Sequence, residues 1–283
     1  MSVIVSIVIG YILDMFIGTP TIFKRGRNAF VKLLKKIYKR LNSKLAVVFT
    51  IFVIAAGGGL AYGIIKLVES YNMICSIGVE SIICYFCISC RDIKDNGERV
   101  HKALKRGYIK RATKLFNKLT ENGETNEPGE IAENIIIMIM DDSIEKVIAP
   151  IFYIMLFGGV GGVVYKLMVL INDASGQLFI RIIKNLADFL PARLGVVFMF
   201  VSVKILSLDF KNAFKVFMKE RYKSRSLNRG LVMSLCAGAL DTKLTFKKSG
   251  VVLGNGDRNV NYADIKKTFE MINIASLLTL VTL

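Results

Sequence analysis

Five long apolar stretches interrupt this chain, and they constrain its fold more than any other feature. They run over Ser2–Gly18, Leu45–Val68, Asn72–Cys90, Val147–Ile171 and Phe189–Leu208. Each approaches the length of about 20 residues with which a helix crosses a bilayer. Hydrophobic residues are 53% of the 283 residues, more than a core of this size can bury without lipid. We therefore predict an all-α, polytopic integral membrane protein with about four to six membrane-inserted helices.

Basic residues are concentrated between the apolar stretches, and the net charge is +17. Residues 20–44 contain no acidic residue and nine basic ones: Lys24, Arg25, Arg27, Lys32, Lys35, Lys36, Lys39, Arg40 and Lys44. Basic loops stay in the cytoplasm. We therefore predict one multi-pass domain over 1–283 in the cell membrane, with cytoplasmic loops near 20–44, 91–146 and 209–270. Met271–Leu283 is too short to cross alone, so we expect it to dock or re-enter.

A cluster of glycines interrupts the fourth apolar stretch: Gly158, Gly159, Gly161 and Gly162. If this stretch crossed the membrane fully, the polar segment Asn172–Arg193 would lie outside. Glycines inside an apolar helix allow the helix to be interrupted. Interrupted helices occur in membrane proteins where other parts of the protein cover the backbone groups that the interruption frees. We therefore predict a broken or re-entrant pair of half-helices.

Two polar segments each allow two interpretations. Arg91–Leu119 has an apolar stripe surrounded by Lys and Arg. It fits a surface that attracts anionic ligands or lipids, but we favour the alternative, a solvated helix that lies against the headgroups. Gly254-Asn255-Gly256 fits either a backbone cradle for phosphate or an ordinary turn.

Acidic residues lie in or beside the apolar stretches. Asp14 is inside the first stretch, where an ionisable group is costly and by default faces a polar cavity or a partner. Asp141, Asp142 and Glu145 precede Ala149-Pro150. Carboxylates at this spacing can hold a hard cation such as Mg²⁺, and they can equally be the charged end of a helix. On the first interpretation Asp141, Asp142 and Glu145 hold the cation.

Two basic residues also lie close to apolar sequence. Lys166 is deep in the fourth stretch, and Arg193 is at the start of the fifth. Each fits an anion clamp or a side chain that extends to the membrane surface. The sequence has no Walker loop, zinc-ligand spacing, or Ser or Cys nucleophile motif, and we expect no nucleic-acid partner.

Several short blocks follow one another over nearly the whole chain. They are GYILDMFIGTP (Gly10–Pro20), VHKALKRGYIKRATKL (Val100–Leu115), VIAPIFYIMLFGGVGGVVYK (Val147–Lys166), FLPARLG (Phe189–Gly195), CAGAL (Cys236–Leu240), LGNGDR (Leu253–Arg258) and ADI (Ala263–Ile265). In content and order they resemble the CobD/CbiB family of cobalamin biosynthesis, the adenosylcobinamide-phosphate synthases.

This resemblance implies a membrane ligase that uses ATP and Mg²⁺. Such an enzyme joins adenosylcobyric acid, a corrinoid, to aminopropanol or its phosphate, and other membrane proteins of the pathway would be its partners. Asp141, Asp142 and Glu145 would be the catalytic residues, and Asp14 and Asp142 would be the metal ligands. The residues expected to bind substrate or phosphate are Lys166, Asn172, Arg193, Asn228 and Arg229.

The chain departs from the family pattern mainly at polar positions. Gly18-Thr19-Pro20 stands where the family has Gly-Asp-Pro, and Asn172 is the last residue of Val-Leu-Ile-Asn where the family has Asn-Thr-Leu-Asp. Asp141 and Glu145 keep a carboxylate at their positions. Because the residues of a metal or nucleotide site act together, an alternative is a catalytically impaired homologue that binds a corrinoid or acts as a scaffold in the membrane.

Overall fold

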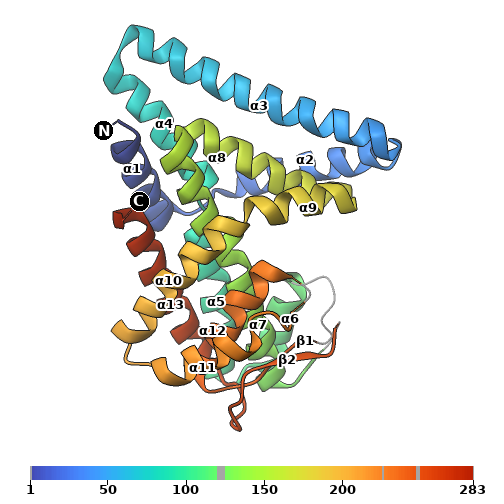
Figure 1. Ribbon diagram of the computed structural model, residues 1–283, viewed down its shortest axis with the longest axis vertical. Helices are drawn as coiled ribbons and strands as arrows, with labels where there is room; N and C mark the ends of the chain where they lie inside the picture. Colours follow the sequence, from blue (N-terminus) through green and yellow to red (C-terminus); the bar gives the residue numbers. More distant parts are fainter. Residues whose placement is uncertain (1, 120–124, 225, 247–248, 283) are drawn as a thin grey trace. The chain divides into compact units, whose positions relative to one another are not determined.

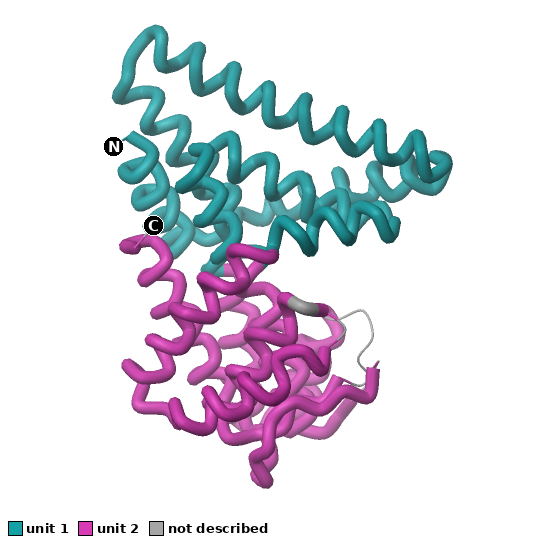
Figure 2. The backbone as a smooth tube through the Cα atoms, in the orientation of Figure 1, with its two compact units in different colours: residues 1–91, 145–188, 283 teal, residues 92–144, 189–282 magenta. Residues whose placement is uncertain are grey.

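A computed structural model describes residues 2–119, 125–224, 226–246 and 249–282. Helices make up almost all of the described chain, and one two-stranded hairpin accompanies them (Figure 1). This confirms the predicted all-α class. Contacts divide the chain into two compact units (Figure 2). Unit 1 comprises residues 1–91 and 145–188, and unit 2 comprises residues 92–144 and 189–282.

Unit 1 is a group of helices arranged around α8. Its elements are α1 (Ser2–Ile17), α2 (Thr21–Tyr38), α3 (Ser43–Tyr71), α4 (Met73–Cys87), a π-helical turn (Ile144–Ile148), α8 (Ala149–Ser175) and α9 (Leu178–Ala187). Helix α8 contacts α1, α2, α3, α4 and α9. It therefore holds the two separate chain segments of unit 1 together.

Helix α3 shows why unit 1 needs lipid. It is 29 residues long, and its apolar side chains are largely exposed: Ile51 by 63%, Phe52 by 66% and Leu60 by 69%. A face of this kind would be an aggregation hazard in water, whereas the hydrocarbon of a bilayer solvates it. Because α3 is long enough to cross a bilayer, lipid is the environment in which its exposed face is stable.

Within the described residues, three helical segments are long and apolar enough to cross a membrane: Ser43–Tyr71, Met73–Lys105 and Pro128–Ser175. Two bent helix pairs, Ser2–Ile17 with Thr21–Tyr38 and Leu178–Ala187 with Phe189–Ile205, raise the number to five if each pair is one span. These numbers agree with a polytopic membrane protein.

The chain turns by 105° between α1 and α2, at Gly18-Thr19-Pro20. Gly18 has a φ of +67°, and a Cβ atom there would lie 2.8 Å from Cγ of Arg91. The hydroxyl of Tyr85 donates a hydrogen bond to the Gly18 carbonyl at 2.5 Å. Pro20 has no backbone N–H, so it suits the position immediately before a new helix. The family-like Gly-Thr-Pro therefore makes a fixed corner.

Helix α8 folds back on itself. Phe157 and Gly158 leave the helical conformation, and Gly158 has a φ of +65°. The rings of Tyr153 and Tyr165 stack 5.1 Å apart. In a continuous helix, residues this far apart in sequence would be separated by about 18 Å. The predicted broken pair of half-helices is confirmed: the two halves of α8 lie side by side.

Unit 2 also combines two chain segments. The first forms α5 (Cys90–Lys105), α6 (Ile109–Leu119) and α7 (Pro128–Ser143). The second forms α10 (Phe189–Ile205), α11 (Phe210–Glu220), α12 (Leu227–Leu240), β1 (Leu244–Phe246), β2 (Val251–Leu253) and α13 (Tyr262–Thr282). Every residue from 231 to 240 is buried, and α12 contacts α7, α10, α11, α13 and β2. The CAGAL block is thus the centre of this unit.

Two predicted segments have different bounds in the structure. The amphipathic region Arg91–Leu119 is two helices, α5 and α6, because Gly107 adopts a φ of +72° between them. Met271–Leu283 is the C-terminal part of a longer helix that begins at Tyr262, and residue 283 lies outside the described residues. Gly107 ends the first helix of the amphipathic region, and the Asn261 side chain, which accepts a hydrogen bond from the Ala263 N–H at 2.8 Å, caps the start of α13.

We predict that Gly161→Ala destabilises unit 1. A Cβ atom at Gly161 would lie 2.3 Å from the Tyr153 carbonyl oxygen and 2.7 Å from Cβ of Phe157, so the halves of α8 would have to separate. Overpacking of this kind costs about 1–3 kcal/mol. The midpoint temperature of unfolding in detergent should fall by at least about 2 °C.

Gly59→Ala in α3 is the matched control, because a Cβ atom at Gly59 would meet nothing within 4 Å and the backbone there is helical. Alanine favours the helix at such a position by up to about 1 kcal/mol. Equal midpoints for Gly161→Ala and Gly59→Ala would contradict the close approach within α8.

Candidate active site

Unit 1 buries a charged network between α8, α9 and the π-helical turn. Lys184 of α9 is 4% exposed, and its ammonium group donates a hydrogen bond to Oε1 of Glu145. The same ammonium lies 2.8 Å from Oδ2 of Asp188. The hydroxyl of Tyr165 donates to Oδ1 of Asp188 at 2.7 Å. The predicted catalytic residue Glu145 is therefore held beside one cation and a second carboxylate.

The π-helical turn determines where Glu145 lies. It interrupts the helical run from α7 to α8 at Ile144–Ile148, and π-turns of this kind are frequent at functional sites. The carbonyl of the next residue, Lys146, accepts a hydrogen bond from the Ser89 N–H at 2.9 Å. The turn thus connects the charged network to the break between α4 and α5.

Asp14 and Lys166 both bind backbone groups at that break. Asp14 is fully buried, and its Oδ2 accepts a hydrogen bond from the Arg91 N–H at 3.0 Å. Nζ of Lys166 donates to the Cys87 carbonyl at 3.1 Å and to Oγ of Ser89 at 3.2 Å. A carboxylate at a helix start and a cation at a helix end are both favourable. Both residues therefore position backbone, and their predicted roles toward metal and phosphate stay predictions.

Unit 2 contains the other predicted acidic residues. Oδ1 of Asp141, near the end of α7, lies 3.3 Å from Nε of Arg229, near the start of α12. Asn228 is 5% exposed, and Asp142 is half-buried. Asp141 and Arg229, predicted separately as catalytic and anion-binding residues, thus form one ion pair.

Arg193 forms contacts within its own helix, α10. Nη1 of Arg193 donates to the Phe189 carbonyl at 2.7 Å, and its guanidinium lies 3.2 Å from the centroid of the Phe189 ring. Asn172 is half-buried in the last part of α8. Arg193 is therefore stabilised within its own helix, and the anion-binding roles of both residues stay predictions.

No three His, Cys, Asp or Glu side chains among the described residues form a group that could hold a metal ion. A Mg²⁺ ion in a substrate complex needs fewer protein ligands, because one or two carboxylates act together with phosphate and water. The predicted metal ligands Asp14 and Asp142 therefore fit Mg²⁺ only as single carboxylates that share the ion with a phosphorylated substrate.

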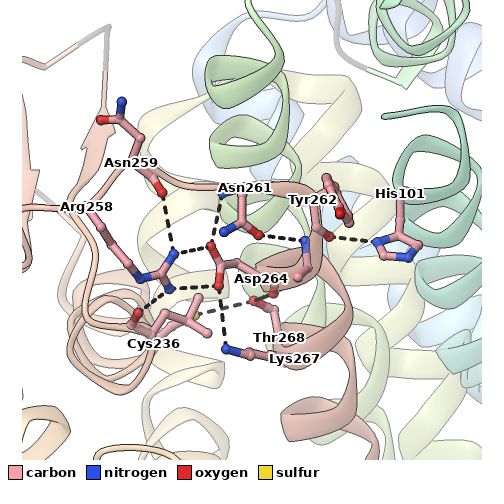
Figure 3. Close-up of polar contacts among 11 residues, drawn as sticks. His101, Cys236, Arg258, Asn259, Asn261, Tyr262, Asp264, Lys267 and Thr268 are labelled. Carbon is pink, nitrogen blue, oxygen red and sulfur yellow. Dashed lines mark hydrogen bonds and ion pairs between the residues drawn. The ribbon is translucent and has the colours of Figure 1, made fainter. Parts of the chain in front are cut away.

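A polar network in unit 2 fixes the loop that contains LGNGDR (Figure 3). Arg258 binds both oxygens of Asp264, each at 2.8 Å, and donates to the Leu240 carbonyl at 2.5 Å. The hydrogen bonds to Asp264 raise the pKa of Arg258 above its usual value. Burial raises the pKa of the nearby Cys236 thiol to about 12. This network joins α12 to the start of α13.

The glycines of the same loop have a packing role. A Cβ atom at Gly254 would lie 2.0 Å from the Thr242 carbonyl oxygen, and one at Gly256 would lie 2.0 Å from that of Asp241. The Gly254 N–H donates to Oε2 of Glu220 at 2.7 Å. Of the two interpretations of Gly254-Asn255-Gly256, the structure favours the turn, because a carboxylate already occupies this backbone donor.

A family model described as "CobD/Cbib protein" matches residues 7–174, more than half of the chain. This chain belongs to the CobD/CbiB family. The matched range contains most of α1, the helices α2 to α7 and nearly all of α8. It therefore includes Asp14, Glu145, Lys166 and the glycine break of α8.

Similar proteins extend the likeness over nearly the whole chain. "Cobalamin biosynthesis protein CobD" of Clostridium perfringens is 29% identical over 98% of this chain and 96% of its own length. "Probable cobalamin biosynthesis protein CobD" of Methanothermobacter thermautotrophicus is 25% identical, over 98% and 94%. "Cobalamin biosynthesis protein CbiB" of Salmonella typhimurium is 21% identical, over 97% and 94%. No solved structure matches the chain significantly.

Sequence reasoning missed the network around Glu145, in which Lys184 binds Glu145 and Asp188, and Tyr165 binds Asp188. Lys184 and Asp188 are spaced by one helical turn, a pattern that favours an ion pair. Their high burial has no signal in the sequence, because an exposed ion pair on a helix has the same spacing.

We predict that Lys184→Ala strongly destabilises the protein. The substitution leaves Glu145 and Asp188 close together without the cation between them. Breaking a buried pair from one side costs about 3–5 kcal/mol. The midpoint temperature of unfolding in detergent should fall sharply.

Lys66→Ala provides the comparison, because Lys66 pairs with Glu69 while the two side chains are 55% and 47% exposed. Exposed pairs contribute about 0–1 kcal/mol. A similar loss for Lys66→Ala and Lys184→Ala would show that the network around Lys184 adds nothing beyond a surface pair.

Proposed function

We propose that this protein is an ATP-dependent, amide-forming ligase of cobalamin biosynthesis in the cell membrane. The family match over residues 7–174, together with relatives similar over nearly the full length, carries the assignment to cobalamin biosynthesis. The proposed substrates are adenosylcobyric acid and aminopropanol or its phosphate. The polytopic, lipid-solvated helices are compatible with an enzyme that works at a membrane surface.

The proposed reaction has two steps. A carboxylate oxygen of adenosylcobyric acid attacks the γ-phosphorus of ATP, and ADP leaves, which gives an acyl phosphate. The amine nitrogen then attacks the carbonyl carbon, the bond to the phosphate oxygen breaks, and inorganic phosphate leaves. The nitrogen must lose a proton to a base for the neutral amide to form.

The acidic residues are the proposed bases and metal-binding groups. Asp141, Asp142 and Glu145 are candidates for accepting the amine proton, and Asp141 already lies beside a cation, Arg229. Glu145 is kept close to Lys184 and Asp188. Buried charges in a membrane protein are costly and usually functional. The burial of the network around Glu145 therefore supports a catalytic role for this residue.

The basic and amide residues are the proposed anion-binding groups: Lys166, Asn172, Arg193, Asn228 and Arg229. Mg²⁺ would neutralise charge on the transferred phosphoryl group. Asp142 and Asp14 are the proposed carboxylate ligands, each sharing the ion with substrate phosphate and water. Chelation of Mg²⁺ should therefore abolish turnover.

We predict that the protein, purified in detergent, forms the amide from adenosylcobyric acid, the amine, ATP and Mg²⁺. Assays with free aminopropanol and with its phosphate identify the preferred amine. Product is detected by mass spectrometry, and ADP release is measured in parallel. Corrinoid binding without amide formation would contradict the ligase and favour a binding or scaffolding protein.

We further predict that Asp142→Ala lowers turnover by about 10²-fold or more, as loss of an acid–base or metal-binding group does. Asp257→Ala is the matched control, because the Asp257 side chain is 98% exposed and its ion pair with Lys243 is on the surface. Rescue of a strain that lacks its own synthase checks both variants in cells. Full rescue by Asp142→Ala would remove this residue from the site.

A further inference from the structure

A groove of about 660 Å³ lies between α5 and α13 in unit 2. Its apolar floor contains Ile265 and Phe269, both on α13. Gly97 of α5 lies over this floor, and a Cβ atom there would be 2.8 Å from Ile139 and 3.7 Å from Ile265. The volume is within the range of about 300–1,000 Å³ typical of small-molecule sites.

Basic side chains dominate the rim of this groove. It is lined by Lys94, Lys102, Lys105, Arg106 and Lys266 against two carboxylates, Glu98 and Glu270. Each carboxylate already pairs with a rim lysine: Glu98 with Lys102 at 2.8 Å and Glu270 with Lys266 at 3.6 Å. Within the described residues, neither Lys105 nor Arg106 forms an ion pair. The groove therefore has a net charge of +3 and two cations available to an anion.

His101 adds an oriented polar atom. Its Nδ1 lies 2.7 Å from the Tyr262 carbonyl oxygen, and Figure 3 marks this hydrogen bond with a dashed line. A carbonyl can only accept, so Nδ1 carries the hydrogen. This hydrogen bond fixes the orientation of the imidazole ring. The ring also contacts the Tyr262 ring, and the two centroids lie 5.7 Å apart. Nζ of Lys94 lies 5.5 Å from the centroid of the Phe269 ring, a cation–π contact.

We propose that this groove binds the phosphate group of an anionic ligand whose apolar part lies against Ile265 and Phe269. Lys105 and Arg106 bind the phosphate oxygens, Lys94 completes the basic edge, and His101 ties α5 to the start of α13 beside them. Charge-assisted hydrogen bonds from Lys and Arg are the usual means of phosphate recognition. Two sources carry such a group: a phosphorylated solute such as a nucleotide, and a phospholipid headgroup.

The assignment of a nucleotide as ligand rests on the proposed ligase function. The experiment therefore measures binding without turnover, so that loss of the groove and loss of the ligase are separate results. The probes are inorganic tripolyphosphate and a non-hydrolysable ATP analogue, each titrated calorimetrically into the full chain in detergent. Retention of phosphatidylglycerol, counted by native mass spectrometry, tests the lipid source.

The test variant is Lys105→Glu combined with Arg106→Glu. We expect it to weaken binding of the phosphate probe, or retention of phosphatidylglycerol, by at least tenfold. Lys110→Glu combined with Arg111→Glu is the control, because it makes the same charge change at exposed positions of α6 outside the groove. We expect the control to change binding less than threefold.

Each outcome decides the proposal. Loss of solute binding in the groove variant alone assigns a phosphorylated solute, and loss of lipid retention alone assigns a phospholipid headgroup. Equal losses in both variants show attraction by general surface charge and overturn the proposal, as does the absence of binding by every probe. Phe269→Leu should weaken binding of the ATP analogue at least threefold and leave the affinity for tripolyphosphate unchanged. An unchanged affinity for the ATP analogue would overturn the proposed role of the apolar floor.

Discussion

The close approach of the two halves of α8 is the constraint on which unit 1 depends. At Gly161 and Gly162 one half lies against the other so closely that a methyl group would meet backbone or Ile154. This contact turns a single apolar stretch into a hairpin that touches five other helices. It also brings Tyr153 and Tyr165 together and points Tyr165 to Asp188. The glycines thus determine where the polar groups of the unit can meet.

The second constraint is the cost of charge away from water. Lys184, Asp188, Asp14 and the turn that carries Glu145 lie among apolar helices, where an uncompensated charge is expensive. In each case a partner of opposite charge or a backbone group lies within hydrogen-bond distance. Asp14 and Lys166 in addition bind the backbone groups freed where α4 ends and α5 begins. Asp14 and Lys166 therefore stabilise helix ends and at the same time place charged groups inside the protein.

Features that depend on hydropathy and on glycine positions could be predicted from the sequence. Features that depend on which charged side chains become buried could not. The apolar stretches, the basic loops and the glycine cluster gave the all-α class and the break of α8. The network of Lys184 and Asp188 was missed because its periodicity equals that of an ordinary surface ion pair. The ion pair between Asp141 and Arg229 joins residues from distant chain segments, and no local pattern reports such a pairing.

For the amphipathic region Arg91–Leu119, the sequence allows two interpretations, and the structure provides the tertiary contacts needed to choose between them. The pattern of Arg91–Leu119 fits both a lipid-facing helix and an anion-binding surface. The structure ends α5 at Lys105 and turns at Gly107, so that the last basic residues of α5 lie at the rim of a groove rather than along one continuous face. Because α13 supplies the floor and lies far along the chain, tertiary contacts such as those of His101 with Tyr262 and of Lys94 with Phe269 are needed to show that this charge surrounds a groove.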